Sequence, residues 1–181
     1  MLRRVILGAA FAYASGAWAQ AAAPSDGLAS TGEYIVGFVQ YVHWPAEDAA
    51  KTWQVCVGSP LGDRTAYYAG RTARGKAFSV RAVAASDALA DCHILDLTNT
   101  SEGDAKAFLA RARPLAILTV GEGERFCTTG GIACLRSHPD GGFEINLSAV
   151  QRARLMVNAQ LLMLGRRRET AGDGPTPGGR L

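Results

Sequence analysis

The sequence predicts a single-domain α/β fold, with a mixed β-sheet flanked by helices, a β-hairpin late in the chain and two disulfides. Short apolar runs rich in β-branched residues alternate with segments of helical periodicity, as strands and helices do in such folds. A His-Pro-Asp-Gly turn at 138–141 separates two further short runs. Four cysteines follow an N-terminal segment typical of exported proteins, and an even count in an oxidising compartment favours disulfides.

Residues 1–19 are typical of a secretory signal peptide. Two arginines form a basic start, an apolar run follows, and Ala17-Trp18-Ala19 supplies the small residues that a signal peptidase recognises. A membrane anchor is the alternative, but the apolar run is short for a bilayer span of roughly 20 residues. We therefore expect export to the periplasm, cleavage near Ala19, a disordered leader over 20–29 and a folded domain over 30–165.

The first expected element is a helix that begins at Ser30. Ser30 and Glu33 have the spacing of a capping box, in which a hydroxyl and a carboxylate satisfy free backbone N–H groups of the first turn. Apolar residues then recur at helical spacing as far as Val42. His43 would close the helix, because Trp44 precedes a proline and such a residue avoids the α conformation.

Strands and helices alternate in the middle of the chain. One helix is expected from Pro60, a favoured first position, to Gly70, a favoured stop. Another begins at Thr100 or Ser101, has an acidic first turn and ends before Pro114. The expected strands are the apolar or alternating runs at 53–58, 76–83, 92–98 and 115–120. The last of these is fully apolar, as in a sheet covered on both faces.

The late hairpin consists of two short strands, at 132–136 and 142–146. A disordered tail is expected over 166–181, because charged residues, glycine and proline dominate there. Between hairpin and tail, a final helix from Ser148 is predicted by one apolar stripe, which consists of Val150, Ala153, Val157, Leu161 and Leu164.

Charge and histidine content argue against several classes of function. The 19 basic and 16 acidic side chains come almost into balance without the signal peptide, so no basic surface for nucleic acid is expected. His93 and Cys92 would point to opposite faces of a strand, and His138 lies in the turn. The sequence has no G-x-S-x-G nucleophile motif and no phosphate-binding glycine loop before a helix. We therefore do not expect an enzyme.

The four cysteines allow three pairings. Cys127 and Cys134 bracket a Thr-Thr-Gly-Gly segment that could be half a metal site, a redox pair or a disulfide loop. They lack the close spacing of zinc ligands and of a C-x-x-C motif, and the glycines permit a reversal that brings the Cα atoms to roughly 5.5 Å. Cys56 and Cys92 lie in expected strands, which would have to be adjacent. Our hypothesis is two disulfides, Cys56–Cys92 and Cys127–Cys134, with no metal and no cofactor.

Seven short motifs occur in an order that is similar to one known family. They are YVHWP (41–45), CVG (56–58), DCHIL (91–95), LTVG (118–121), FC followed by GGI (126–132), FEINL (143–147) and QLLxL (160–164). In this order and spacing, over about residues 32–165, the chain resembles the YfiR family of periplasmic proteins. It departs from the family pattern in the less apolar segment Ile132–Leu135 and in the tail after Arg166.

The resemblance implies a mixed sheet flanked by helices, the same two disulfides and often a dimer. It also implies a non-enzymatic regulator that binds the periplasmic sensor domain of an inner-membrane diguanylate cyclase of the YfiN type. Binding would hold the cyclase off and so control cyclic di-GMP and biofilm formation, and an outer-membrane lipoprotein of the YfiB type would sequester the regulator. Some family members accompany sensor kinases instead, which is an alternative.

The hairpin is the candidate partner-binding surface, because repression needs only a surface with differential affinity for one state of the partner. A patch held by a disulfide also loses less entropy on binding. The alternative is ordinary core for Phe143 and Ile145 and a solvated charge for Glu144. Another alternative function is a small-ligand module, with a pocket among Tyr34, Phe38, Tyr41 and Trp44. The candidate binding residues are Ile132, Leu135, Phe143, Glu144, Ile145 and Asn146.

Overall fold

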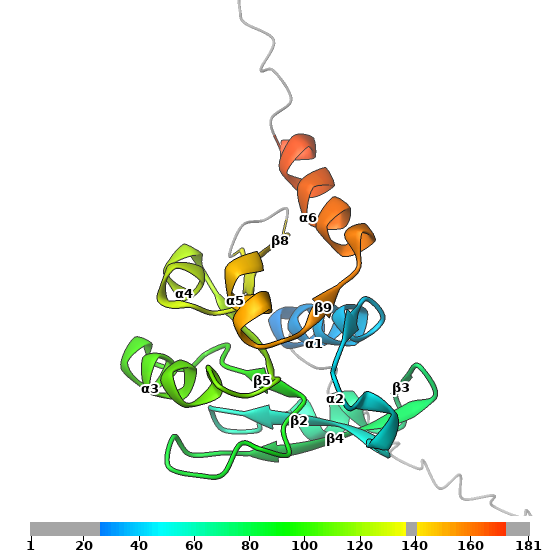
Figure 1. Cartoon of the computed structure of the whole chain (residues 1–181), viewed down its shortest axis with the longest axis vertical. Helices are drawn as coiled ribbons and strands as arrows, with labels where there is room; N and C mark the ends of the chain where they lie inside the picture. Colours follow the sequence, from blue (N-terminus) through cyan, green and yellow to red (C-terminus); the bar gives the residue numbers. More distant parts are fainter. Residues whose placement is uncertain (1–25, 137–140, 173–181) are drawn as a thin grey trace, which may run out of the picture.

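The computed structural model describes residues 26–136 and 141–172, which are built around one seven-stranded sheet (Figure 1). The strands lie in the order β3-β4-β2-β5-β6-β7-β8. The five inner strands are parallel, and the antiparallel strands β3 and β8 form the edges. The predicted mixed sheet flanked by helices is confirmed. The strands are β2 (Thr52–Val57), β3 (Thr72–Ala73), β4 (Lys76–Ala82), β5 (Ile94–Asp96), β6 (Leu118–Glu122), β7 (Ala133–Leu135) and β8 (Phe143–Ile145).

Helices cover both faces of the sheet. Side chains of α1, α2, α5 and α6 join the core on one face, and side chains of α3 and α4 join the core on the other. In Figure 1, α3 and α4 lie side by side and α6 extends away from the body. The helices are α1 (Asp26–Val39), α2 (Arg64–Tyr68), α3 (Glu102–Ala112), α4 (Glu124–Thr129), α5 (Leu147–Arg152), α6 (Ala159–Gly172) and the 3-10 turn η1 (Glu47–Ala49). A small antiparallel sheet pairs β1 (Val42–His43) with β9 (Met156–Val157).

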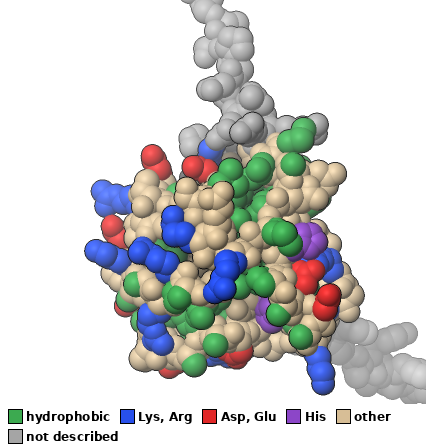
Figure 2. All heavy atoms as spheres, in the orientation of Figure 1, with side chains coloured by type: hydrophobic (Ala, Val, Ile, Leu, Met, Phe, Trp, Pro, Cys, Tyr) green, Lys and Arg blue, Asp and Glu red, His purple; other side chains and the backbone are tan. Residues whose placement is uncertain are grey.

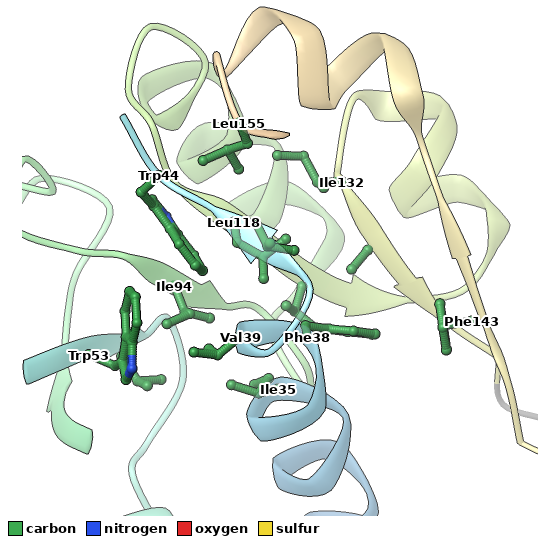
Figure 3. Close-up of a cluster of buried hydrophobic side chains, with 14 of the residues drawn as sticks. Ile35, Phe38, Val39, Trp44, Trp53, Ile94, Leu118, Ile132, Phe143 and Leu155 are labelled. Atoms are coloured by element: carbon green, nitrogen blue, oxygen red, sulfur yellow. The ribbon is translucent and has the colours of Figure 1, made fainter. Parts of the chain in front are cut away.

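Side chains alternate between the two cores along each strand. Val55 of β2 faces α1, whereas the next residue, Cys56, faces α3. Figure 3 shows the α1 side, where Ile35 and Phe38 of α1 meet Ile94 and neighbouring side chains of the sheet. Because both faces are covered, β2, β5, β6 and β7 are largely buried and mostly apolar, and this is why the sequence identifies them, whereas β4 is identified by its alternation of apolar and polar residues.

A buried ion pair closes the edge of the sheet where the parallel strands β2 and β5 end. Arg64 Nε donates to Asp96 Oδ2 at 2.9 Å, and the two residues are only 6% and 1% exposed. The same guanidinium donates to the hydroxyl and carbonyl of Thr98 and to the carbonyl of Pro60. Asp96 Oδ1 accepts from the Thr98 N–H and hydroxyl, at 2.9 and 2.6 Å. This network joins α2 to the residues that follow both strands.

Several predicted elements are present with shifted ends. The strands expected at 53–58 and 76–83 are β2 and β4, and Ser101 caps α3 by accepting the Asp104 N–H at 3.1 Å. β5 begins only at Ile94, so Cys92 and His93 precede the strand. The helix expected from Pro60 shortens to α2, because Gly62 adopts a left-handed backbone with a φ of 48°.

The first helix ends earlier than predicted. It stops at Val39, and Val42 and His43 form β1, so the prediction that His43 closes the helix is wrong. Val42 pairs with Val157, which lies more than a hundred residues away and which local periodicity does not reveal. The cation at the helix end is Arg74, whose guanidinium donates to the carbonyl oxygens of Val39 and Val42.

Both segments predicted to be disordered are helical where the structure describes them. α1 begins at Asp26, inside the leader predicted over 20–29, and α6 continues to Gly172, inside the tail predicted over 166–181. Arginine, glutamate and alanine over 166–171 favour a helix, and the next proline comes only at Pro175. The predicted signal peptide lies outside the described residues.

The predicted final helix is two helices separated by a strand. α5 is capped by Asn146, whose Oδ1 accepts a backbone N–H of the first turn at 3.1 Å, and Ser148 is already helical. Arg154 then adopts a φ of 55°, which ends the helical path, and Val157 pairs with Val42. Pairing between distant residues therefore overrides the helical pattern of the sequence.

The Arg64–Asp96 pair provides a test of this fold. Arg64→Met should lower the free energy of unfolding by about 3–5 kcal/mol, because it leaves the Asp96 carboxylate buried without a cation. Arg64→Met with Asp96→Leu should recover part of that loss, and the exposed pair of Arg125 and Glu102 supplies the control. Arg125→Gln should cost less than about 1 kcal/mol. Urea unfolding followed by circular dichroism gives each value, and equal losses for Arg64→Met and Arg125→Gln would contradict the buried role.

Candidate functional site

The predicted loop between Cys127 and Cys134 contains a short helix and the start of a strand, closed by a disulfide. Cys127 lies in α4 and Cys134 in β7, with Cα atoms 5.7 Å apart. α4 ends at Gly130, whose φ of 112° lets its N–H bond to the Cys127 carbonyl. The other disulfide joins Cys56 to Cys92. Both predicted pairs are confirmed.

Two glycines allow α4 to pack closely on the sheet. The ring of Phe126 lies against Gly121 in β6 and against Gly131 before β7. A Cβ atom would stand 2.5 Å from the ring at Gly121 and 2.2 Å from it at Gly131, closer than such atoms approach. Phe126 is therefore fixed between the two strands, and α4 cannot shift without unpacking it.

Asn146 connects the hairpin to the disulfide. Its Nδ2 donates to the Cys127 carbonyl at 2.9 Å, while its Oδ1 caps α5 through the Ala149 N–H. One side chain therefore holds the end of β8, the helix α4 and the helix α5 together. Asn146 was a candidate partner-binding residue, and its amide is occupied by contacts within the chain.

The hairpin is present, but three of the six candidate partner-binding residues face the core. Ile132, Leu135 and Phe143 are only 3, 6 and 5% exposed. The ring of Phe143 packs edge-on against Phe38, with centroids 4.9 Å apart. These three side chains are core, as the alternative held for Phe143, because side chains of α1 and α6 cover the face of the hairpin that carries them.

The other three candidates are more accessible and lie at the end of β8 and just after it. Glu144 is exposed, and Ile145 and Asn146 are half-buried. Glu144 lies on the face of β8 opposite Phe143, as its alternation with Phe143 and Ile145 predicts. We call Glu144, Ile145 and Asn146 the hairpin rim.

A second surface, which the sequence analysis did not single out, lies close to the hairpin rim. α6 packs on β8, and Gly165 permits this, since a Cβ there would stand 3.1 Å from the Phe143 carbonyl oxygen. Figure 2 shows hydrophobic side chains gathered over the region of α5, α6 and β9. Of the four large apolar residues that are exposed there, only Leu164 belongs to the stripe from which the final helix was predicted. The other three lie off that stripe, and this was the signal by which the sequence could have indicated an exposed apolar surface. The apolar patch consists of Leu147, Met156, Met163 and Leu164, which are 50, 66, 55 and 42% exposed.

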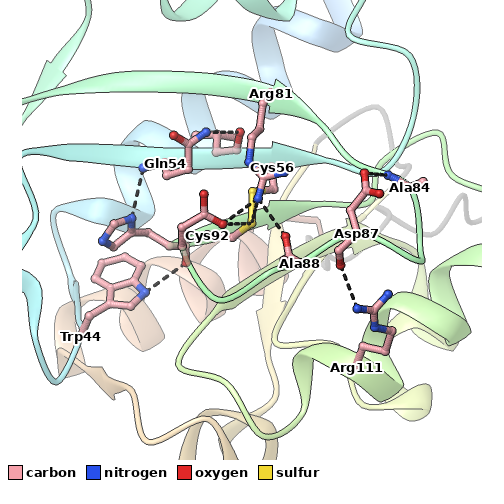
Figure 4. The surroundings of a disulfide bond; sticks show 12 residues. Trp44, Gln54, Cys56, Arg81, Ala84, Asp87, Ala88, Cys92 and Arg111 are labelled. Carbon is pink, nitrogen blue, oxygen red and sulfur yellow. Dashed lines mark hydrogen bonds and ion pairs between the residues drawn. A yellow bond between two sulfur atoms is a disulfide. The ribbon is translucent and has the colours of Figure 1, made fainter.

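The residues around the Cys56–Cys92 disulfide hold the loop between β4 and β5 in place (Figure 4). Arg81 Nη2 donates to Asp91 Oδ1 at 2.6 Å and to the Ala88 carbonyl at 2.9 Å, beside the sulfur of Cys92. Arg111 of α3 donates to the carbonyl of Asp87 in the same loop. The loop between β4 and β5 is thus held to the sheet by the disulfide and by two arginines.

The aromatic side chains that were candidates for a ligand pocket are packed. Phe38 and Trp44 are buried, and the ring centroid of Trp44 lies 5.0 Å from that of Trp53 and 6.2 Å from that of His93. Tyr34 contacts Phe38 and Phe143, and Tyr41, like Tyr34, is half-buried. Phe38 and Trp44 therefore belong to the core, and Tyr34 and Tyr41 pack against it.

The two described histidines have different hydrogen-bond partners. His43 Nδ1 lies 3.3 Å from Glu47 Oε1, whereas His93 Nδ1 accepts the Gln54 N–H at 3.2 Å. Burial lowers the pKa of His93 from its ordinary 6.5, the Lys76 cation lowers it further, and the nearby Asp91 opposes the shift. His138 lies outside the described residues. Within the described part of the chain, no group of three or more His, Cys, Asp or Glu side chains could hold a metal ion.

A cleft of about 400 Å³ opens between α3 and α4, away from the hairpin rim. It lies where the adjacent parallel strands β5 and β6 end and their chains turn into the two helices. Leu97, Leu109 and Phe126 provide its apolar wall, and Glu102 and Arg125 form an exposed ion pair, 3.4 Å long, between the helices. Sequence analysis missed this cleft because its position depends on which strands are neighbours.

Sheet order, helical layers and two cross-links together define a disulfide-stabilised α/β domain. The chain belongs to the YfiR/HmsC-like family, whose model matches residues 29–166. No curated protein matches the sequence. A crystal structure of a conserved domain protein from Vibrio cholerae O1 biovar eltor strain N16961 is similar, with a TM-score of 0.54 and 12% identity. The match covers 76% of this chain and 58% of that protein, and at this identity it supports the fold alone. No helix among the described residues is long and apolar enough to cross a membrane.

The two disulfides should contribute unequally to stability. Cys56 and Cys92 are 36 residues apart and Cys127 and Cys134 only 7, so loop-closure entropy predicts about 4 and about 2.5 kcal/mol. Replacing both cysteines by alanine in each pair gives matched variants, since all four sulfurs are buried. Urea unfolding should show the larger loss for the Cys56–Cys92 variant. A larger loss of stability for the Cys127–Cys134 variant would contradict an origin of the stabilisation in loop-closure entropy.

His93 should make stability depend on pH. Its pKa is lower in the folded chain than in the unfolded one, so the unfolded state binds the proton more readily. Stability should therefore fall as the pH decreases from about 7 through the folded pKa, because protonation at Nδ1 also removes the acceptor for Gln54. His93→Asn keeps an acceptor that does not titrate and should flatten this decline in urea unfolding between pH 7 and 5. An unchanged pH profile in that variant would contradict the assignment.

Proposed function

We propose that this chain is a periplasmic, non-enzymatic regulator that binds the periplasmic sensor domain of an inner-membrane signalling enzyme and represses it. The enzyme would be a diguanylate cyclase, so that release of the regulator raises cyclic di-GMP. The observation that carries the proposal is membership of the YfiR/HmsC-like family over 29–166, nearly all of the described chain. An outer-membrane lipoprotein would sequester the regulator, and a homodimer would be its resting form.

Two features support export. All four cysteines are paired, which suits an oxidising compartment, and residues 1–19 have the pattern of a signal peptide. The arrangement of side chains supports binding over catalysis. The buried polar groups Arg64, Asp96 and Thr98 satisfy one another, and none of them lines the cleft or the hairpin rim.

The partner surface that we propose combines the hairpin rim with the apolar patch. Exposed methionine and leucine side chains supply apolar contact area of the kind found at the centre of protein interfaces. Glu144 supplies a charge at the border. The Cys127–Cys134 disulfide and Asn146 hold this surface in one shape, so little conformational entropy is lost on binding.

Binding can be measured between the oxidised chain and the immobilised periplasmic domain of the membrane cyclase encoded in the same genome. Met156→Asp and Glu144→Arg should each weaken binding about tenfold or more, because they place a charge in the apolar contact and reverse a charge at its border. Glu33→Arg makes the same change of charge at an exposed position of α1, outside this surface, and should leave the affinity unchanged. Replacing Cys127 and Cys134 by serine should leave a folded domain with weaker binding.

The outcome also separates the alternatives. Binding to a sensor-kinase periplasmic domain and not to the cyclase would favour the accessory role for a kinase. This surface would be excluded as the binding site for the cyclase if the three variants Met156→Asp, Glu144→Arg and Glu33→Arg bound the cyclase with equal affinity. No binding to either domain would overturn the proposed function. Light scattering of the free chain tests the homodimer.

A further inference from the structure

Two successive crevices lie at the carboxyl edge of the parallel sheet, one between β2 and β5 and the next between β5 and β6. Of these two, the chain itself fills only the first. From β2 the chain passes to β4 on one side and then to β5 on the other, so the strand order reverses between β2 and β5. Open parallel sheets bind ligands at such a point. Here Arg64 occupies it, bonded to Asp96 and Thr98 after β5 and to Pro60 after β2.

The next crevice, between β5 and β6, is the cleft between α3 and α4. Asn99 follows β5 with a φ of 58°, and Gly123 follows β6 with a φ of 79°. Both chains therefore turn sharply before entering their helices, and the two helices stand side by side above the strand ends (Figure 1). The volume of about 400 Å³ falls in the range of about 300–1,000 Å³ typical of small-molecule sites.

The wall of the cleft is suited to a compact apolar body. Leu97, Leu109 and Phe126 are 3, 6 and 7% exposed and are held by the core beneath them. Phe126 is also fixed between Gly121 and Gly131. The wall is thus preformed, so a ligand would not have to order it on binding.

Polar groups of the cleft are left without partners by the chain. The Thr100 hydroxyl oxygen is shielded from solvent and has no hydrogen-bond partner among the described residues. Glu102 and Arg125 pair with each other. Of the other charged residues that line the cleft, Glu122, Glu124 and Lys106 make no ion pair within the described part of the chain.

The unpaired charges of the lining sum to one negative charge, with two carboxylates at the end of β6 and the start of α4 and one ammonium on α3. We propose that this cleft binds a small organic cation, an amine carried on a compact apolar body. The body lies on Leu97, Leu109 and Phe126, and the ammonium group faces Glu122 and Glu124. The site is separate from the hairpin rim and the apolar patch, so it stands or falls independently of the proposed regulatory partner.

Three probes with one ring and different charge test this site on the oxidised full chain. They are phenethylamine, neutral 2-phenylethanol and anionic 3-phenylpropionate, titrated while amide chemical shifts are followed by NMR. Phenethylamine should bind most tightly and 3-phenylpropionate least. The shift changes should concentrate on the residues after β5 and β6 and on the facing sides of α3 and α4.

Matched variants separate charge from shape. Glu122→Gln with Glu124→Gln should weaken phenethylamine binding about fivefold and leave 2-phenylethanol unchanged, because two exposed carboxylates are lost. Glu33→Gln with Asp48→Asn removes two exposed carboxylates outside the cleft and should change neither. Ala105→Trp places a ring in the cleft and should abolish binding of all three probes.

Three results would overturn the proposal. They are no binding of phenethylamine at millimolar concentration, equal binding of all three probes, and shift changes centred outside the cleft. If Ala105→Trp does not fold, the two carboxamide variants decide the question by themselves. Loss of partner binding with intact amine binding, or the reverse, would show which of the two proposals has failed.

Discussion

The contact on which the rest of the structure depends is the buried network of Arg64, Asp96 and Thr98. α2 has only five residues, too few to be stable alone, and the guanidinium anchors it to the end of β5 and to the residues that follow it. Taking both charges from water is costly, and the cost is offset only because the guanidinium and the carboxylate are almost fully hydrogen-bonded. Any displacement of α2 would leave two charges unpaired in the core. The network therefore fixes the path of the chain from β2 to β4 and fills the crevice at the strand-order reversal.

The sequence predicts β2, β5 and β6 because burial on both faces makes them largely apolar, and it predicts β4 because apolar and polar residues alternate there. Burial also explains why the hairpin was mistaken for a binding surface. Ile132, Leu135 and Phe143 were predicted to bind a partner, but they are apolar because α1 and α6 cover them. Val42 and Val157 were assigned to helices because their pairing joins distant segments, which periodicity does not register. The disulfide pairs could be predicted, since spacing and compartment restrict them. The cleft could not be predicted, because it arises from which elements become neighbours, and the apolar patch had only one signal in the sequence, the position of three of its residues off the predicted core stripe.

Both disulfides belong to the core on the α3 side of the sheet, the smaller of the two. The larger core is closed by four helices and needs no covalent help. On the other face, α4 has six residues and the segment before β5 has no regular structure, so burial alone holds them weakly. Cys127–Cys134 ties α4 to β7, and Cys56–Cys92 ties that segment to β2. Each cross-link therefore ties a short or irregular segment to a strand of the sheet.

The positions of these disulfides determine how the cleft and the hairpin rim are connected. α4 contributes Phe126 and Arg125 to the cleft, and through Cys127 it is bound both to β7 and to Asn146 at the hairpin rim. Among the described residues, its salt bridge to α3 is the exposed Glu102–Arg125 pair, which contributes at most about 1 kcal/mol. Buried side chains on both helices, Leu109 of α3 and Phe126 of α4, hold them more firmly than this ion pair does, so a ligand has to fit the cleft as it stands. The hairpin rim keeps its shape whether the cleft is empty or filled, because α4 is joined to β7 by the disulfide and to Asn146 by a hydrogen bond.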